Sequence, residues 1–204
     1  MSATTQTRNS SSAALFNLTR CAILVAMAIV LDLFEIPVVA FYKLDLSALP
    51  AIIGGFAMGP VQGLAVVVVK NLIRMLRSDS MFVGQLADVL MVGSFVLVSS
   101  LLYRRNKTQK GALIAAIAGT ATMIVASVLV NYFILIPAYQ VLMGLPLEVI
   151  VGMGSAVWSY IDNTVKLVIF ITAPFNLLKG VVLSVVTFLL YKRVSPLLHQ
   201  RSAR

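Results

Sequence analysis

Charged side chains are scarce in this chain, and the segment FYKLDLSALP places two of them, Lys43 and Asp45, between long apolar runs. Only 11% of the 204 residues are charged, whereas 60% are hydrophobic. A charge in such surroundings is costly unless it faces water, a partner or a ligand. Lys43 and Asp45 are therefore either functional residues or ordinary solvated loop charges.

Polar residues further along the chain interrupt apolar runs at spacings that could form a binding site. Gln85 and Asp88 are three residues apart, as are Asn163 and Lys166, which places each pair on one face of a helix. Asn131 follows a long apolar stretch, where a lone amide needs a partner, either another helix or a ligand. If the two faces meet Asn131, they form an apolar-walled pocket for a small, mostly apolar molecule with a few hydrogen-bonding edges.

Other polar residues lie near the ends of apolar runs, where long side chains can reach water. They are Asp32, Glu35, Arg74 and Arg77. In the topology predicted below, nearly all polar residues belong to the outer half of the protein, and only Asn176 and Lys179 lie in the inner half. We therefore expect the ligand site in the outer half.

No motif in the sequence indicates catalysis. The G-x-x-x-x-G-K-[ST] pattern of nucleotide-binding loops is absent, so ATP hydrolysis would need a partner protein. The one histidine, His199, lies in a basic tail, and the one cysteine, Cys21, excludes an internal disulfide and a cysteine metal cluster. We expect no enzyme activity, no metal site and no cofactor, which leaves uptake or channel function.

The composition indicates the class of protein that carries these residues. A mean hydropathy of +0.98 is too high for a soluble domain of 204 residues, so the chain is predicted to be an all-α integral membrane protein in a lipid bilayer. The net charge is +9, from 16 Lys and Arg against 7 Asp and Glu. The basic residues flank apolar runs, so they indicate topology and anionic lipid, and no nucleic-acid partner is expected.

Six membrane helices are predicted, at about 14–35, 47–58, 61–77, 82–103, 112–137 and 162–191. The second and third are separated at Gly59-Pro60, because proline is tolerated in the first turn of a helix but not in its interior. The alternative is one span over 46–69 and five helices in all. Six helices place more of the basic residues on the cytoplasmic side, together with both termini, and we favour them.

The remaining segments are predicted from their composition. Residues 1–13 are polar and are expected to be a disordered cytoplasmic N-terminus, 14–195 to form a single membrane domain, and 196–204 to be a basic cytoplasmic tail. The connection 138–161 is apolar but is interrupted by proline and glycine. It is predicted to be an interfacial loop with Trp158 and Tyr160 at the headgroup level, and a short re-entrant helix is the alternative.

An ordered set of short motifs resembles a known transport family. In chain order they are Lys43-Leu44-Asp45-Leu46-Ser47, Leu49-Pro50-Ala51, Gly59-Pro60, Gly63, Lys70-Asn71, Gly84-Gln85-x-Ala87, Asn131-Tyr132, Pro137-x-Tyr139 and Pro174-Phe175-Asn176-x-x-Lys179-Gly180. Over about residues 14–195 the chain resembles the riboflavin-specific S-component, the substrate-binding subunit, of energy-coupling factor (ECF) transporters. Other S-components, for thiamine, folate or pantothenate, and a channel or structural membrane subunit are the alternatives.

The resemblance implies a six-helix subunit of the cell membrane that binds riboflavin, or FMN, with high affinity. Its partners would be a membrane coupling subunit and two cytoplasmic ATPases, which fits the missing nucleotide-binding loop. Ala22 and Ala26 form a small-x-x-x-small pattern in the first helix. In S-components an alanine motif of this kind docks on the coupling subunit, so these two residues are expected to serve assembly.

The resemblance also suggests roles for the polar residues. The first loop would close over riboflavin as a lid, with Lys43 and Asp45 pairing with bundle residues or the ribityl chain, and Tyr42 and Leu44 covering the ring system. Asn131, Asp88 and Lys166 would donate or accept hydrogen bonds to the ligand, beside Gln85 and Asn163. The chain departs from the family pattern at Ala48, Val67 and Asp88. A buried, charged Asp88 would need Lys166 or Lys43 close by.

Overall fold

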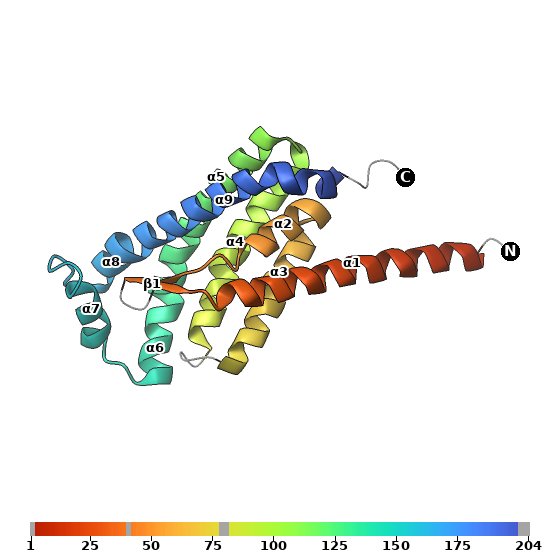
Figure 1. The fold of residues 1–204 in the computed structure, drawn as a ribbon. Helices are drawn as coiled ribbons and strands as arrows, with labels where there is room; N and C mark the ends of the chain where they lie inside the picture. Colours follow the sequence, from red (N-terminus) through yellow and green to blue (C-terminus); the bar gives the residue numbers. More distant parts are fainter. Residues whose placement is uncertain (1–2, 40–41, 78–81, 200–204) are drawn as a thin grey trace.

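The computed structural model describes residues 3–39, 42–77 and 82–199, with side chains between Leu15 and Tyr191. Long helical rods dominate it (Figure 1). They are α1 (Ala3–Asp32), α4 (Val83–Arg105), and α5 (Gln109–Val130) with its continuation through the π-helical segment η2 (Asn131–Leu135) into α6 (Ile136–Met143). A fourth rod comprises α8 (Thr164–Leu167), the π-helical segment η3 (Val168–Thr172) and α9 (Ala173–His199).

Shorter elements fill the space between these rods. A hairpin of β1 (Ile36–Val39) and β2 (Tyr42–Leu44) follows α1, and α2 (Leu49–Met58) and α3 (Pro60–Arg74) form a helical pair that ends in a 3-10 turn, η1 (Met75–Arg77). The hairpin strands are antiparallel, with Ile36 opposite Leu44 and Val39 opposite Tyr42. A separate short helix, α7 (Leu147–Ser155), lies between α6 and α8.

The predicted class, a mostly helical membrane protein, is confirmed, but the predicted count of six membrane helices is not. Within the part of the chain that the structure describes, four segments are long and apolar enough to cross a membrane: Leu15–Asp32, Val83–Arg105, Gln109–Met143 and Thr164–Tyr191. Helices α2 and α3 are shorter, and α7 was not counted among the six predicted helices. The all-α class is correct for most of the chain but omitted the hairpin, whose strands are only four and three residues long.

The predicted break at Gly59-Pro60 is confirmed. Gly59 has a φ of 118°, which a residue with a side chain rarely adopts, and Pro60 begins α3. The two helices then pack closely, because a Cβ atom on Gly63 would lie only 2.8 Å from Cα of Gly55 and 2.9 Å from the carbonyl oxygen of Ala51. Glycine at position 63 therefore allows the backbones of α2 and α3 to approach.

The ends of the chain differ from the sequence prediction. Helix α1 begins at Ala3, so most of the segment 1–13 expected to be disordered is helical, and residues 1 and 2 lie outside the described residues. No glycine or proline interrupts residues 3–32, so extending an apolar helix outward costs little. Helix α9 likewise runs to His199, into the predicted tail, of which 200–204 lie outside the described residues.

The connection 138–161 is more ordered than the predicted interfacial loop. Its first part extends α6 to Met143, where Gly144 adopts the left-handed conformation that ends the helix. Pro146 precedes α7, so the alternative of a short helix is the better description. Trp158 and Tyr160 follow α7 and are half exposed.

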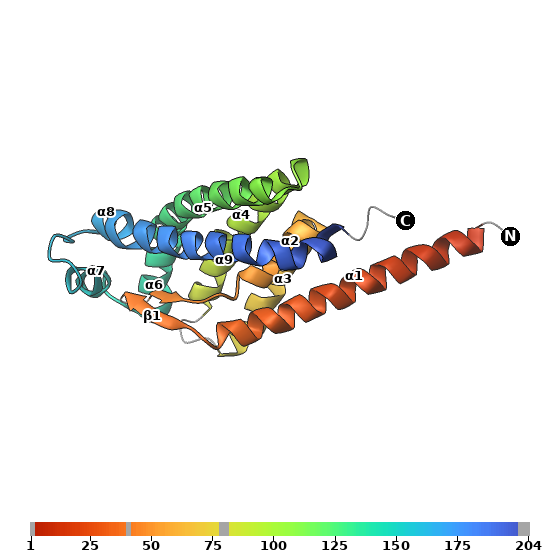
Figure 2. The ribbon, with the colours of Figure 1, turned by 45° about the horizontal axis from the view of Figure 1, so that its top comes forward.

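The main core lies where α2, α3, α4, α5 and α9 pack together. Phe56 on α2 stacks on Tyr103 of α4, with ring centroids 4.3 Å apart, and the Tyr103 hydroxyl is 3.1 Å from that of Tyr191 on α9. In both views the first part of α1 extends away from the bundle, and the two chain ends lie on the same side of the molecule (Figures 1 and 2). The hairpin and α7 lie toward the opposite side.

Candidate ligand-binding site

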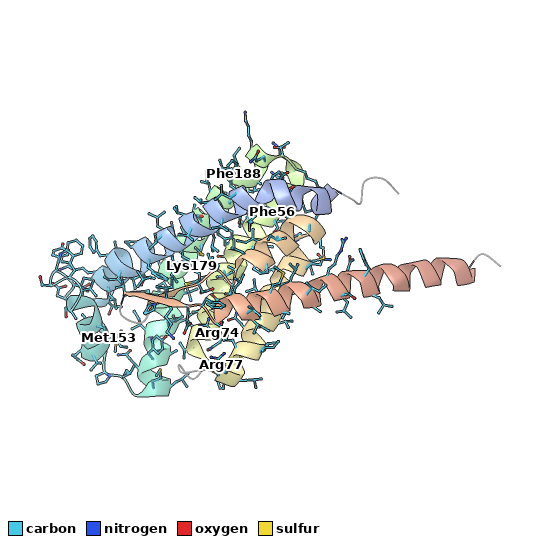
Figure 3. The ribbon with its side chains drawn as sticks, in the orientation of Figure 1. Phe56, Arg74, Arg77, Met153, Lys179 and Phe188 are labelled. Atoms are coloured by element: carbon cyan, nitrogen blue, oxygen red, sulfur yellow. The ribbon has the colours of Figure 1, made fainter. Side chains whose placement is uncertain are left out.

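A cavity of about 510 Å³ opens where the hairpin and the connecting segments meet the bundle, a size typical of small-molecule sites. Figure 3 labels four of its lining residues, Arg74 of α3, Arg77 of η1, Met153 of α7 and Lys179 of α9. Residues from α1, the hairpin, α4, α6 and η2 complete the lining. The polar members are Asp32, Glu35, Tyr42, Lys43, Asp45, Lys70, Arg74, Arg77, Gln85, Asp88, Tyr139, Asn176 and Lys179.

Four buried charges meet on one side of this cavity. Nζ of Lys70 donates to Oδ2 of Asp88 at 2.7 Å, and Nζ of Lys179 lies 3.1 Å from Oδ2 of Asp45 and 3.6 Å from Oδ1 of Asp88. Two lysines thus balance two aspartates, which is what makes their burial tolerable. We call these four residues the charge cluster.

Neighbouring polar groups complete the hydrogen bonding of the charge cluster. Nδ2 of Asn71 donates to Asp88 at 2.9 Å, and the backbone N–H of Ser47 donates to Oδ1 of Asp45 at 2.8 Å. Burial alone would raise the pKa of Asp45, but the charges of Lys179 and Lys70 and the Ser47 hydrogen bond outweigh it. The pKa of Asp45 therefore lies below its ordinary value, and the carboxylate is ionised.

Aromatic and apolar side chains form the other side of the cavity. Tyr42 stacks on Phe175 with ring centroids 4.8 Å apart and an interplanar angle of 25°. Apolar lining residues include Met91 of α4, Leu135 of η2, Met143 of α6, and Ile150 and Met153 of α7. Methionine side chains are flexible and adapt to the shape of a ring system. The cavity thus joins an aromatic, apolar wall to an ionic one.

A second, more exposed group of charges forms the rim. Arg74 pairs with Asp32 at 3.0 Å and with Glu35 at 2.9 Å, and Lys43 contacts Glu35. The Lys43 side chain is 44% exposed, so this contact contributes little to stability. The rim ties the end of α1 to the end of α3 beside the hairpin.

Five of the predicted ligand residues line the cavity: Tyr42, Lys43, Asp45, Gln85 and Asp88. The other four do not. Leu44 packs in a neighbouring apolar cluster, and Asn131 lies behind Tyr42, whose hydroxyl donates to its Oδ1 at 3.0 Å. Asn163 and Lys166 lie away from the cavity.

The reason for this last difference is the direction of the side chains around their helix. The Asn163 side chain accepts from the backbone N–H of Lys166 and so caps α8. Nζ of Lys166 lies 2.6 Å from Asp162 and 4.2 Å from the ring centre of Tyr160, on the exposed surface. The expectation that this pair faces the ligand pocket beside Asn131 is therefore wrong.

The partners of Asp88 also differ from the expectation. The sequence suggested Lys166 or Lys43, whereas the structure pairs Asp88 with Lys70 and Lys179. Lys179 was assigned to the inner half of the protein, away from the site. The segment after β2 enters the bundle, where Asp45 is only 5% exposed, and so brings the first loop to Lys179. Burying a lysine within an apolar run is costly, so Lys70 and Lys179 could have indicated buried acidic partners from the sequence alone.

The predicted docking residues lie on the surface of α1. Ala22 and Ala26 are exposed, whereas Val25 and Ala28 face the bundle and are buried. The small residues therefore belong to a face of α1 that the described part of the chain leaves uncovered.

Among the residues that the structure describes, no group of three or more His, Cys, Asp or Glu residues could hold a metal ion.

Comparisons with known proteins agree with this architecture. A solved structure described as the S component of a bacterial ECF transporter superposes with a TM-score of 0.72 and 31% identity, over 92% of this chain and 99% of that one. The riboflavin transporter RibU of Staphylococcus aureus is 32% identical over 83% of this chain and 85% of its own length. The riboflavin transporter FmnP of Bacillus subtilis is 30% identical over 87% of this chain and 90% of its own length.

The family profile agrees with these relatives over nearly the whole membrane domain. The profile described as "ECF transporter, substrate-specific component" matches residues 16–191, from the first apolar turn of α1 to the last described side chain of α9. It therefore includes every residue of the charge cluster. The chain belongs to the family of substrate-specific components of ECF transporters.

Proposed function

We propose that this chain captures riboflavin at the outer face of the cell membrane and presents it for ATP-driven uptake. The observation that carries the proposal is the two-sided cavity of about 510 Å³. Riboflavin combines a flat, fused ring system with a polar pyrimidine edge and a hydroxylated ribityl chain. An aromatic, apolar wall suits the rings, and an ionic wall suits the hydroxyl groups and the polar edge. FMN, which adds a phosphate to the ribityl chain, is the alternative ligand.

The proposed ligand residues are those that line the cavity. Tyr42, Phe175 and the methionines would contact the rings. Gln85, Asp88, Asn176 and Lys179 would hydrogen-bond the ligand, since they come from the two helices α4 and α9 that enclose it. Two relatives named as riboflavin transporters support this choice of vitamin.

The proposed orientation places both termini in the cytoplasm. Arg104 and Arg105 end α4 and Lys110 begins α5, at the side of the molecule where the chain ends lie (Figure 1). Lys and Arg are enriched on the cytoplasmic side of membrane proteins. The hairpin then faces outward, where it can admit the vitamin.

Transport would require partners that supply the energy. The sequence contains no nucleotide-binding loop of the G-x-x-x-x-G-K-[ST] type, so two cytoplasmic ATPases and a membrane coupling subunit are proposed to complete the transporter. The exposed Ala22 and Ala26 support a role for α1 in this assembly, because small residues let another helix approach closely.

Flavin fluorescence tests the proposal directly. Protein purified in detergent from cells grown with riboflavin should be yellow, and after removal of the flavin it should quench riboflavin fluorescence in a saturable titration. Thiamine and pantothenate in excess should not compete. Competition by either vitamin, or no quenching by folded protein, would overturn the assignment of riboflavin.

A further inference from the structure

The hydroxyl group of Tyr42 joins the hairpin to two helical rods, the one that contains η2 and the one that contains η3. It donates to Oδ1 of Asn131 at 3.0 Å and shares a short hydrogen bond with Oγ1 of Thr172. Asn131 is 89 residues away in the chain and Thr172 is 130 residues away. Tyr42 itself is 8% exposed, so this contact is made inside the protein.

Both partners belong to π-helical segments. Asn131 begins η2 and Thr172 ends η3, and these two segments contact each other. A π-helical turn interrupts the regular register of an α-helix and is often found at functional sites. Here the two interruptions lie side by side, and each presents one polar side chain to the same hydroxyl.

Neither partner lines the cavity. Asn131 and Thr172 are 2% and 1% exposed. The Asn131 amide is already engaged, because Nδ2 donates to the carbonyl oxygen of Ser127 at 2.8 Å and its Oδ1 accepts from Tyr42. Tyr42, whose ring stacks on Phe175, is the member of this arrangement that lines the cavity.

We propose that Asn131 and Thr172 are positioning residues that retain the ligand by holding Tyr42, without touching the ligand themselves. This inference rests on the proposed function, since it concerns the release of riboflavin from the same cavity. Release requires the hairpin to open, and opening breaks the hydrogen bonds of the Tyr42 hydroxyl. Loss of those bonds should therefore raise the rate of riboflavin release more than it lowers the rate of association.

A double-mutant cycle tests the inference. Riboflavin release is measured by stopped-flow fluorescence for Tyr42→Phe, which keeps the ring, for Thr172→Val, which keeps the shape, and for the double variant. Tyr42→Phe should speed release about fivefold, the usual effect of one buried hydrogen bond. Thr172→Val should speed release in the wild-type background, but it should add nothing once the Tyr42 hydroxyl is gone.

The same test applies to Asn131. Asn131→Ala should speed release alone and add nothing in the Tyr42→Phe background. Thr187→Val is the matched control for Thr172→Val, because Thr187 lies on the same helix rod, is 4% exposed, and its hydroxyl has no hydrogen-bond partner among the described residues. This control should release riboflavin at the wild-type rate.

A measurement without ligand separates the inference from the proposed function. In flavin-free protein, Tyr42→Phe and Thr172→Val should accelerate hydrogen exchange in Ile36–Val39 and Tyr42–Leu44, whereas Thr187→Val should not. Multiplicative effects on release, or unchanged exchange in Tyr42→Phe, would overturn the inference. Failure of the wild-type protein to bind riboflavin would overturn the proposed function, while the exchange result would still decide the role of Tyr42.

Discussion

Nζ of Lys179 lies 3.1 Å from Oδ2 of Asp45, and both side chains are buried, at 8% and 5% exposure. The pair joins α9 to the segment that follows the hairpin, 134 residues earlier in the chain. A buried ion pair adds little stability compared with apolar packing, but removing one partner leaves an uncompensated charge and is costly. The connection between hairpin and bundle is therefore sensitive to either residue.

Asp45 and Lys43 should accordingly behave differently, although they are two residues apart. Asp45→Asn removes the charge that faces Lys179 and should speed riboflavin release at least about tenfold, because the hairpin segment loses its buried ion pair. Lys43→Ala removes a largely exposed contact to Glu35 and should change the rate less than about fivefold. Stopped-flow release rates measure both. Equal effects would mean that the hairpin is not held through Asp45.

Lys179 and Lys166 form a second informative pair, because only Lys179 lines the cavity. Lys179→Ala should weaken riboflavin binding at least about tenfold, through loss of a buried charged hydrogen-bond donor. Lys166→Ala should leave the dissociation constant within about twofold, since Lys166 pairs with Asp162 at the surface. Fluorescence titration gives the constants, and thermal unfolding of flavin-free protein shows whether Lys179→Ala still folds. A strong effect of Lys166→Ala would contradict the placement of the site.

The comparison of these lysines shows what the sequence could and could not predict. Gly59-Pro60 specifies a helix break through backbone conformation alone, so that feature was predictable from two residues. The direction of Lys166 depends on which face of α8 packs against the bundle, which no local pattern determines. Lys70 and Lys179 could have been linked to Asp88 by the cost of burying a charge, but the particular pairing depends on the path of the chain after β2.

The fold followed the sequence best where backbone conformation or hydrophobic length decides the structure. The long apolar runs became helices, whereas the hairpin and α7, which depend on tertiary packing, were missed or described as loop. The site was predicted only in part, because the direction of each side chain also depends on tertiary packing. Tyr42, Asp45 and Asp88 line the cavity, but Asn131 contacts it only through Tyr42.

Close packing of α2 and α3 gives a prediction about stability. A methyl group at position 63 would meet backbone atoms of Gly55 and Ala51 at under 3 Å, so Gly63→Ala should lower the thermal unfolding temperature in detergent by several degrees. Gly152→Ala is the matched control, since a Cβ atom there meets nothing within 4 Å and glycine in a helix is destabilising by roughly 0.5–1 kcal/mol relative to alanine. This control should unfold at the wild-type temperature or above. Equal unfolding temperatures would show that the helix pair has room to separate.

The exposed face of α1 gives the last prediction. Ala22 and Ala26 are exposed and do not line the cavity, whose α1 lining begins at Ile29, so a bulky side chain there should not disturb ligand binding. Ala26→Trp should abolish riboflavin uptake in cells and co-purification with the coupling subunit, because a close helix contact cannot accommodate the indole ring. Met27→Trp, on another exposed face of the same helix turn, is the control and should retain both. If Ala26→Trp instead lost flavin binding together with uptake, Ala26 would support the fold of the subunit and would not serve its assembly.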